Sequence, residues 1–278
     1  MHIYSIIGDV WGMDGGVAYG VIPKTIWNKL TVANERNFIR MITRCMLVVD
    51  DDKKILIEVG MGNKQRSRYY EVRERNDDYN VVKSLGEVGY KPEDITDVIF
   101  THLHDDHVGA ATYYDNGDIK HTFVNANYWV SKDQWEWALA RNKREYAAFL
   151  PENLTPLLQS GRLNLVEKGQ QPFKNIELRL FYGHTIGLIA PIIHYKDKVI
   201  VFGSDFLPSA YHLPFPYIAA ADIQPLVTLE EKEKFLPEAF NNNYFMFYCH
   251  DTDNEVTTIQ QNEKGYVMGE TFLLEEIL

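Results

Sequence analysis

The stretch Asp97-Val98-Ile99-Phe100-Thr101-His102-Leu103-His104-Asp105-Asp106-His107 is the part of the sequence that decides the fold. Its first half is an apolar run typical of a buried strand, and its second half is a polar loop. His102 and His104 are one residue apart, so in an extended loop their side chains point the same way. Imidazole nitrogens and carboxylate oxygens are ligands that zinc, manganese and iron accept. Since three histidines this close would be costly to bury without partners, the stretch predicts a metal site at a strand end.

Three later apolar runs also end in a donor of this type. His184 follows the run Leu178–Tyr182, Asp205 follows Val199–Ser204, and His250 follows Tyr244–Cys249. In order, placement and residue type, the four segments resemble the metallo-β-lactamase fold superfamily, whose signature is His-x-His-x-Asp-His. The resemblance implies an α/β fold, an αββα sandwich of two mixed sheets packed face to face with helices on the outer faces. It implies one domain over residues 1–278.

The resemblance also implies two divalent metal ions, most simply zinc, with manganese or iron as alternatives. One ion would be held by His102, His104 and His184, the other by Asp106, His107 and His250, with Asp205 bridging them. Five histidines and two carboxylates exceed the needs of one four-coordinate ion. A bridging hydroxide would be the nucleophile, with Asp106 and Asp205 as the catalytic carboxylates.

Some positions depart from the family pattern. Glu58 stands where many members carry the Asp of Asp-Thr-Gly, and we expect it to hydrogen-bond a ligand histidine from behind. Asp105 is the variable position of the signature and is expected to face solvent or a loop amide. Lactonases of the family usually place a Tyr about three residues after the bridging Asp, whereas the nearest here is Tyr211. Tyr211 and His212 are candidate substrate contacts.

Helical patterns lie between the apolar runs. Asn80–Gly89 has helical spacing and ends in Gly, and Ser131 to Gln134 matches a capping box that opens a helix carrying Trp135, Leu139, Tyr146 and Phe149. Thr228–Asn241 is expected to be a third helix with Thr228 as its N-cap. Strands alternating with helices indicate a sheet-rich core covered by helices.

Composition excludes several kinds of partner. The 278 residues carry a formal net charge of −11, which disfavours nucleic acid as a partner. No Lys or Arg lies within several residues of the ligand segments. The N-terminus lacks a signal-peptide pattern and no apolar window is long enough to span a bilayer, so we expect a cytoplasmic protein without a membrane partner. Cys45 and Cys249 are expected to be buried thiols.

The expected function is hydrolysis of a small ester, lactone or related small-molecule substrate. Secreted β-lactamases, glyoxalase-II-like enzymes and nucleases fit less well, because the leader, the basic C-terminal helical domain and the nucleic-acid module are not recognisable. A phosphotriesterase-type hydrolase and an iron-dependent oxidoreductase that resembles persulfide dioxygenases remain alternatives, as does a non-catalytic metal-binding protein. The aromatic fraction of 13% fits either an apolar pocket or a homodimer interface.

Overall fold

The computed structural model describes residues 1–263 and 265–278. The chain divides into two compact units: Met1–Val10 with Ile42–Lys168, and Trp11–Met41 with Gly169–Leu278. Strands β1 (His2–Asp14) and β2 (Phe38–Asp50) contribute residues to both units. The expectation of one domain stays a prediction, and each unit is described by itself.

The first unit is built on a six-stranded mixed sheet with the order β1-β2-β3-β4-β7-β8. Strands β2 and β3 pair antiparallel, whereas β3, β4, β7 and β8 run parallel. The remaining strands are β3 (Lys53–Ile57), β4 (Asp97–Ile99), β7 (Asn127–Ser131) and β8 (Leu163–Val166), and a separate hairpin joins β5 (Thr112–Asp115) and β6 (Asp118–His121). Because β3 and β4 are parallel neighbours, their carboxyl ends, where Glu58 and His102 follow, lie at the same edge.

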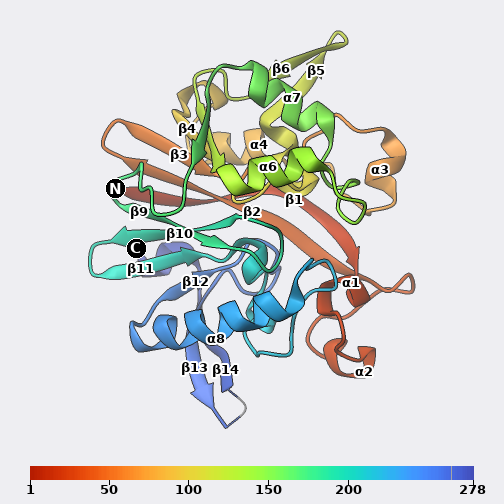
Figure 1. The fold of residues 1–278 in the computed structure, drawn as a ribbon, viewed down its shortest axis with the longest axis vertical. Coiled ribbons are helices and arrows are strands. Elements are labelled where there is room, and N and C mark those ends of the chain that lie inside the picture. The colour runs from red at the N-terminus through yellow and green to blue at the C-terminus, as the bar shows by residue number, and fades with distance from the viewer. Residues whose placement is uncertain (264) are drawn as a thin grey trace. The chain divides into compact units, whose positions relative to one another are not determined.

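Three amphipathic helices cover this sheet. Leu85 of α4, Trp135 of α6 and Leu157 of α7 are buried in one core cluster with strand residues such as Leu56 and Val98. The three helices and the strands are labelled in Figure 1. The helices of the unit are α3 (Ser67–Glu71), α4 (Val81–Glu87), α5 (Asp105–Val108), α6 (Lys132–Ala140) and α7 (Pro151–Gln159), with short 3₁₀ turns η1 (Pro92–Asp94) and η2 (Gly109–Ala111).

The second unit has its own six-stranded mixed sheet, in the order β14-β13-β12-β11-β10-β9. All its neighbours pair antiparallel except β11 and β12. Its strands are β9 (Ile176–Phe181), β10 (Leu188–Tyr195), β11 (Lys198–Phe202), β12 (Phe245–Phe247), β13 (Val256–Asn262) and β14 (Gly265–Phe272). The prediction of two mixed sheets is confirmed.

One long helix, α8 (Pro225–Asn241), lies along this second sheet (Figure 1). It buries Phe235, Leu236 and Ala239 in the core cluster that the sheet shares. The N-terminal segment adds the short helices α1 (Gly15–Tyr19) and α2 (Lys24–Trp27). The remaining 3₁₀ turns are η3 (Ser204–Phe206), η4 (Ala210–His212) and η5 (Leu274–Ile277).

The structure corrects two helix predictions. The capping box at Ser131 is present, because its side chain accepts from the Gln134 amide, but α6 ends at Ala140 and does not reach Tyr146 or Phe149. Arg141 adopts the left-handed conformation there and turns the chain away. Helix α8 begins three residues before Thr228, so Thr228 is an interior residue and not the N-cap. Pro225, at the first position, starts the helix instead.

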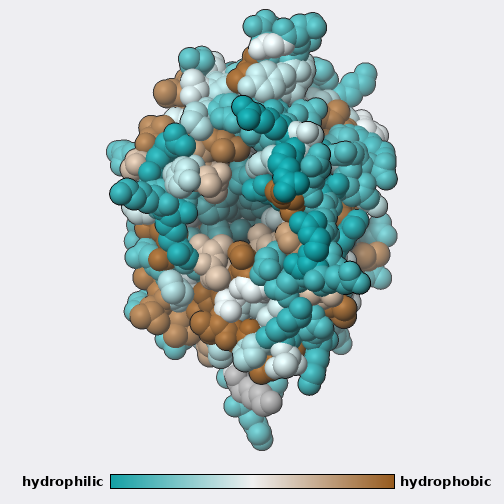
Figure 2. All heavy atoms as spheres, turned by 90° about the vertical axis from the view of Figure 1, so that its right-hand side faces the viewer, coloured by the Kyte–Doolittle hydropathy of each residue, from teal (hydrophilic) through white to brown (hydrophobic). Residues whose placement is uncertain are grey.

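The described helices are short or polar, and one face of the molecule can be seen in Figure 2. Among the described residues, no helix combines the length and apolar character needed to cross a bilayer. Figure 2 shows the side of the molecule that carries α1 and α2, where hydrophilic side chains predominate and hydrophobic ones gather in smaller groups. Both cysteines are buried and reduced, as expected.

Candidate metal centre

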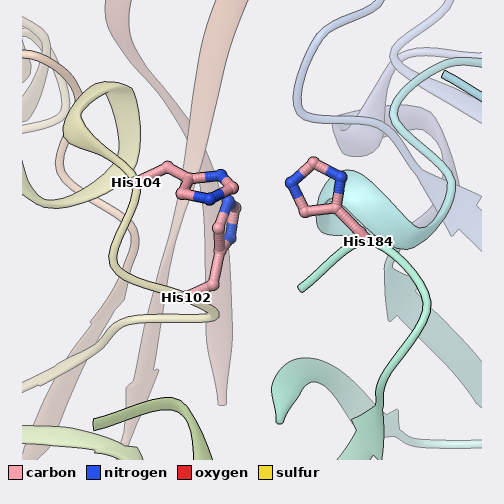
Figure 3. A group of neighbouring side chains, drawn as sticks. All are labelled: His102, His104 and His184. Carbon is pink, nitrogen blue, oxygen red and sulfur yellow. The ribbon is translucent and has the colours of Figure 1, made fainter. Parts of the chain in front are cut away.

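The loop after β4 brings three histidines of the first unit together. His102 and His104, drawn in Figure 3, have ring centroids 4.5 Å apart, and the rings of His102 and His107 are 4.1 Å apart. His102 and His107 are fully buried. His107 lies on the single-turn helix α5, which also carries Asp106, whose Oδ2 is 3.4 Å from His107 Nε2. The residues predicted from the signature therefore do cluster within this unit.

Side chains that hydrogen-bond one nitrogen of a histidine ring, here called outer partners, determine which nitrogen can bind a metal. His104 Nε2 lies 3.1 Å from Glu145 Oε1, and since a carboxylate only accepts, Nε2 donates and Nδ1 is the nitrogen that suits a metal. Glu145 also accepts from Trp137 and Asn142, which holds it in place. His102 Nδ1 lies 2.9 Å from Thr101 Oγ1, which leaves Nε2 to the metal side.

Glu58 supports the same group from beneath, as its place after β3 suggested. Its Oε2 accepts from His107 Nδ1 at 2.6 Å, and its Oε1 accepts from the Thr101 amide at 2.8 Å. Its backbone takes the left-handed conformation, with φ 68°. The longer side chain thus reaches His107, one of the predicted metal ligands, and it ties the loop after β3 to the loop after β4. Its effect on metal affinity stays a prediction.

The loop after Glu58 is held by a buried acid that the sequence did not single out. Asp9 on β1 accepts from the Met61 amide at 2.6 Å and lies 3.0 Å from Arg75 Nε. Burial raises the pKa of Asp9 to about 7, although Arg75 lowers it. Arg75 also donates to the carbonyl of Gly62. The pair therefore holds two adjacent residues, Met61 and Gly62, of the loop that follows Glu58.

Asp105 is where the sequence prediction is wrong. It is buried, accepts from the Tyr69 hydroxyl, and forms an ion pair with Arg73 at 3.4 Å. The sequence also shows no basic residue within several positions of the ligand loops, yet buried Lys64 donates to the carbonyls of Gly109 and Thr112, two and five residues after His107. Both contacts join segments more than 30 residues apart, which local sequence reading cannot see.

In the second unit, His184 lies in the loop after β9 (Figure 3). Helix α8 and the loop before it position its side chain. His184 Nδ1 donates to Asp222 at 2.9 Å, and Asp222 accepts from the Thr228 hydroxyl at 2.6 Å, which leaves Nε2 to the metal side. Glu231 accepts from the amides of Tyr182 and Gly183. A side chain at Gly183 would collide with Thr228, so only glycine allows α8 this close.

The other donors of the second unit are Asp205 and His250, with Cys249 beside them. Asp205 Oδ1 lies 3.1 Å from His250 Nε2, and its Oδ2 lies 3.3 Å from His184 Nε2. Burial lowers the pKa of His250, but Cys249 and Asp205 outweigh this and raise it well above its ordinary value. The cluster therefore favours a positive charge among its donors, whether a proton or a metal ion.

Tyr211 and His212, the candidate substrate contacts, line a small cavity of about 20 Å³ with His250. Both His212 nitrogens are engaged, Nδ1 with Ser209 Oγ at 2.7 Å and Nε2 with the Ala18 carbonyl at 2.9 Å. Burial lowers the pKa of His212 to about 4, so the ring is neutral and Nε2 donates. His212 ties the N-terminal segment to this loop, and a substrate contact stays a prediction for both residues.

The donor sets fit divalent transition metals. In the second unit, one donor atom each of Asp205, Cys249 and His250 lies within 4.8 Å of the others. In the first unit the same holds for His102 and His107, with Glu58 behind them. Sequence reading missed the outer partners Glu145, Asp222 and Thr101, and only Thr101 had a local signal, its place beside His102. Such partners orient the ligand and raise its basicity.

Comparisons with known proteins agree with this chemistry. A family model described as the metallo-beta-lactamase superfamily matches residues 39–255. An N-acyl homoserine lactonase of Bacillus thuringiensis is 23% identical over 230 residues, which cover 76% of this chain and 82% of the relative. The relative thus shares most of its length with this chain.

Two solved structures are similar over nearly the whole chain. A probable metal-dependent hydrolase from Staphylococcus aureus superposes with a TM-score of 0.88 and 27% identity, covering 98% of each chain. AidC, a dizinc quorum-quenching lactonase solved with a product, superposes with a TM-score of 0.79 and 20% identity, covering 98% of this chain and 95% of AidC. These likenesses confirm the expected fold class.

Proposed function

The chain is a metal-dependent hydrolase of the metallo-beta-lactamase superfamily, and from this premise we propose that it opens a small lactone or ester with two divalent metal ions. The observation that best supports the proposal is the hydrogen bonding of the histidine rings. His102, His104, His107 and His184 each have one nitrogen engaged by an outer partner, so the opposite nitrogen is preset for a metal.

The proposed ligand assignment follows the family order. His102, His104 and His184 would hold one ion, Asp106, His107 and His250 would hold the other, and Asp205 would contribute its carboxylate to both. Zinc is the expected metal because imidazole and carboxylate suit it, and because the similar lactonase AidC is a dizinc enzyme. Both units then act together as one domain, with donors drawn from each.

The chain's own residues perform the proton transfers. Bound divalent ions supply a nucleophilic water at neutral pH and polarise a carbonyl. Asp106, whose side chain is 14% exposed, accepts the proton of the attacking water and returns it to the departing alkoxide. Glu58 keeps His107 in the tautomer that leaves Nε2 for the metal, and Asp222 does the same for His184.

The aromatic segment after His212 and the net charge of the chain both favour a small, weakly charged substrate. Lys232 of α8 donates to the carbonyls of Pro214 and Tyr217 and so holds the aromatic segment after His212 in place. We infer that this segment forms an apolar wall for the substrate. The net charge of −11 disfavours polyanions. The lactonase relatives favour a lactone over the phosphotriester alternative, and hydrolysis over iron-dependent oxidation.

A substrate panel tests the proposal. Zinc- or manganese-loaded protein is assayed with N-acyl homoserine lactones, aryl esters, phosphotriesters, a chromogenic β-lactam and RNA, alongside elemental analysis. We expect close to two ions per chain and the highest kcat/KM for a lactone or ester. A best activity on RNA or the β-lactam, or full activity with one ion or fewer, would contradict it.

Two matched variants test the ligand assignment. Asp205→Asn should abolish most of the activity and lower the metal content, because the proposed bridge is lost. Asp105→Asn changes the neighbouring carboxylate of the signature, which contacts Tyr69 and Arg73, and should keep the metal content. Equal metal losses in both variants would mean that the assignment is wrong.

A further inference from the structure

We propose that Cys249 is a metal ligand, so that its sulfur, Asp205 and His250 form a thiolate-containing donor set in the second unit. The inference rests on the proposed metal-binding function but not on its substrate. The three residues are neighbours in space, with one donor atom from each lying within 4.8 Å of the others. All three belong to the same compact unit.

The spacing of these donors matches that around one ion. A zinc ion lies about 2.3 Å from sulfur and about 2.0 Å from nitrogen or oxygen, so tetrahedral ligands are roughly 3.5 Å apart for sulfur with oxygen and roughly 3.3 Å for nitrogen with oxygen. The Cys249 sulfur is 3.5 Å from Asp205 Oδ1, and His250 Nε2 is 3.1 Å from that same oxygen. Both distances fit without rearrangement.

The segment that carries the sulfur is fixed on both sides. The Tyr248 amide donates to Glu255, and the His250 amide donates to Pro208. Asp251 then accepts from the amides of Ala210 and Asn254, which closes the turn. Cys249 is fully buried. A thiol held in one orientation toward two donors is prepared for coordination and is protected from external oxidants.

The chemistry of binding balances simply. The metal ion displaces the proton of the Cys249 thiol, the proton leaves to solvent, and a metal–sulfur bond forms without any change of oxidation state. A thiolate is a soft ligand, so it favours zinc and cadmium over manganese and magnesium. Cys249 would therefore bias the site toward zinc, a selectivity that the histidines and carboxylates alone do not impose.

The test is cobalt(II) substitution of the full-length protein, read by its absorption spectrum. We expect a thiolate-to-cobalt charge-transfer band in the near ultraviolet for the wild type, and its loss in Cys249→Ser. Cys45→Ser is the matched control and should keep the band, since Cys45 is the other buried cysteine and lies in β2 of the first unit beside Gly8. A wild-type spectrum without the band would overturn the inference.

Metal competition provides the quantitative readout. Cys249→Ser should lower the affinity for cadmium by at least about 10-fold, because replacing a residue that only supports a ligand already costs about that much. The affinity for manganese should change much less. Equal losses for both metals would indicate that Cys249 only donates a hydrogen bond to Asp205, and would contradict ligation.

A measurement on the unmodified protein covers the case in which the variant does not fold. X-ray absorption of the zinc-loaded wild type and of Cys45→Ser should show a sulfur shell at about 2.3 Å from zinc, averaging about half a sulfur per zinc when two ions are bound to each chain. A shell of nitrogen and oxygen alone refutes the inference, even if the protein hydrolyses lactones. A sulfur shell without hydrolysis supports the inference and counts against the proposed function, so the two failures are distinguishable.

Discussion

Two buried carboxylates, Glu58 and Asp222, do similar work in the two units. Each accepts a hydrogen bond from Nδ1 of one histidine that is a predicted metal ligand. The second oxygen of Glu58 accepts from the Thr101 amide, and the second oxygen of Asp222 accepts from the Thr228 hydroxyl. A carboxylate can accept at both oxygens, whereas an amide side chain must donate at one end. These residues are therefore sensitive to a change of a single atom.

Glu58→Gln and Asp222→Asn should each lower metal affinity by roughly 10–100-fold, because the amide cannot satisfy both donors and the histidine loses its fixed tautomer. Metal titration with a chromophoric chelator measures this. Asp97→Asn is the matched control: Asp97 is also buried and multiply bonded, to Lys53 and Trp129, but stands at the start of β4. Unchanged metal affinity in Glu58→Gln and Asp222→Asn would show that these two carboxylates do not support metal binding.

Helix α8 shows how one element can organise a site without supplying a ligand. Three of its residues hydrogen-bond the loops around it. Thr228 donates to Asp222, and Glu231 accepts from the Tyr182 and Gly183 amides. Lys232 donates to the carbonyls of Pro214 and Tyr217. Burial lowers the pKa of Lys232 to about 7 and raises that of Glu231 to about 7. The helix thus carries buried polar groups whose ionisation depends on pH near neutrality.

Glu231 should make the protein less stable as pH rises toward neutrality. Its pKa is raised from 4.5 to about 7, chiefly by burial, so between these values the folded state binds more protons than the unfolded state and the free energy of unfolding falls with rising pH. Urea unfolding of chelator-treated protein at several pH values measures the slope. In Glu231→Gln the free energy of unfolding should fall less steeply with pH. The same pH dependence in the variant and the wild type would contradict the raised pKa of Glu231 as its cause.

The elements differ in how far the sequence predicts them. The loop after β4 was readable because its donors are contiguous, and α4 was readable because its apolar residues recur at helical spacing and Gly89 follows its end. Helix α6 was extended too far, because nothing in the helical spacing announces the left-handed Arg141. Asp222 and Glu145 were not found, since each meets its histidine across about 40 residues of chain and only tertiary packing brings them together. Contiguous ligands were predictable, and their remote supports were not.

At the scale of the whole molecule, the proposed centre takes donors from both compact units. His102, His104, Asp106 and His107 belong to the first unit, and His184, Asp205 and His250 belong to the second. Acidic residues exceed basic ones by 39 to 28, so binding divalent cations also lowers the overall negative charge. Metal binding should therefore be linked to the folding of the entire chain.

Loading with zinc should raise the melting temperature of the protein in one cooperative transition. A ligand at 100 times its dissociation constant adds about 2.7 kcal/mol to the free energy of unfolding if it binds only the folded state. In domains of roughly 150–250 residues, 1 kcal/mol corresponds to about 2–4 °C, so a rise of roughly 5–10 °C is expected for one site. Calorimetry of the chelated and zinc-loaded protein measures it.

The shape of the calorimetric transition decides whether one domain or two bind the metal. If both units fold as one domain around shared ions, the whole transition moves upward, and Asp205→Asn, which lacks the proposed bridge, moves much less. Asp97→Asn should shift as much as the wild type, because its carboxylate lies away from the ligand end of β4. Two separate transitions, of which zinc moves only one, would contradict the single-domain prediction and confine the metal to one unit.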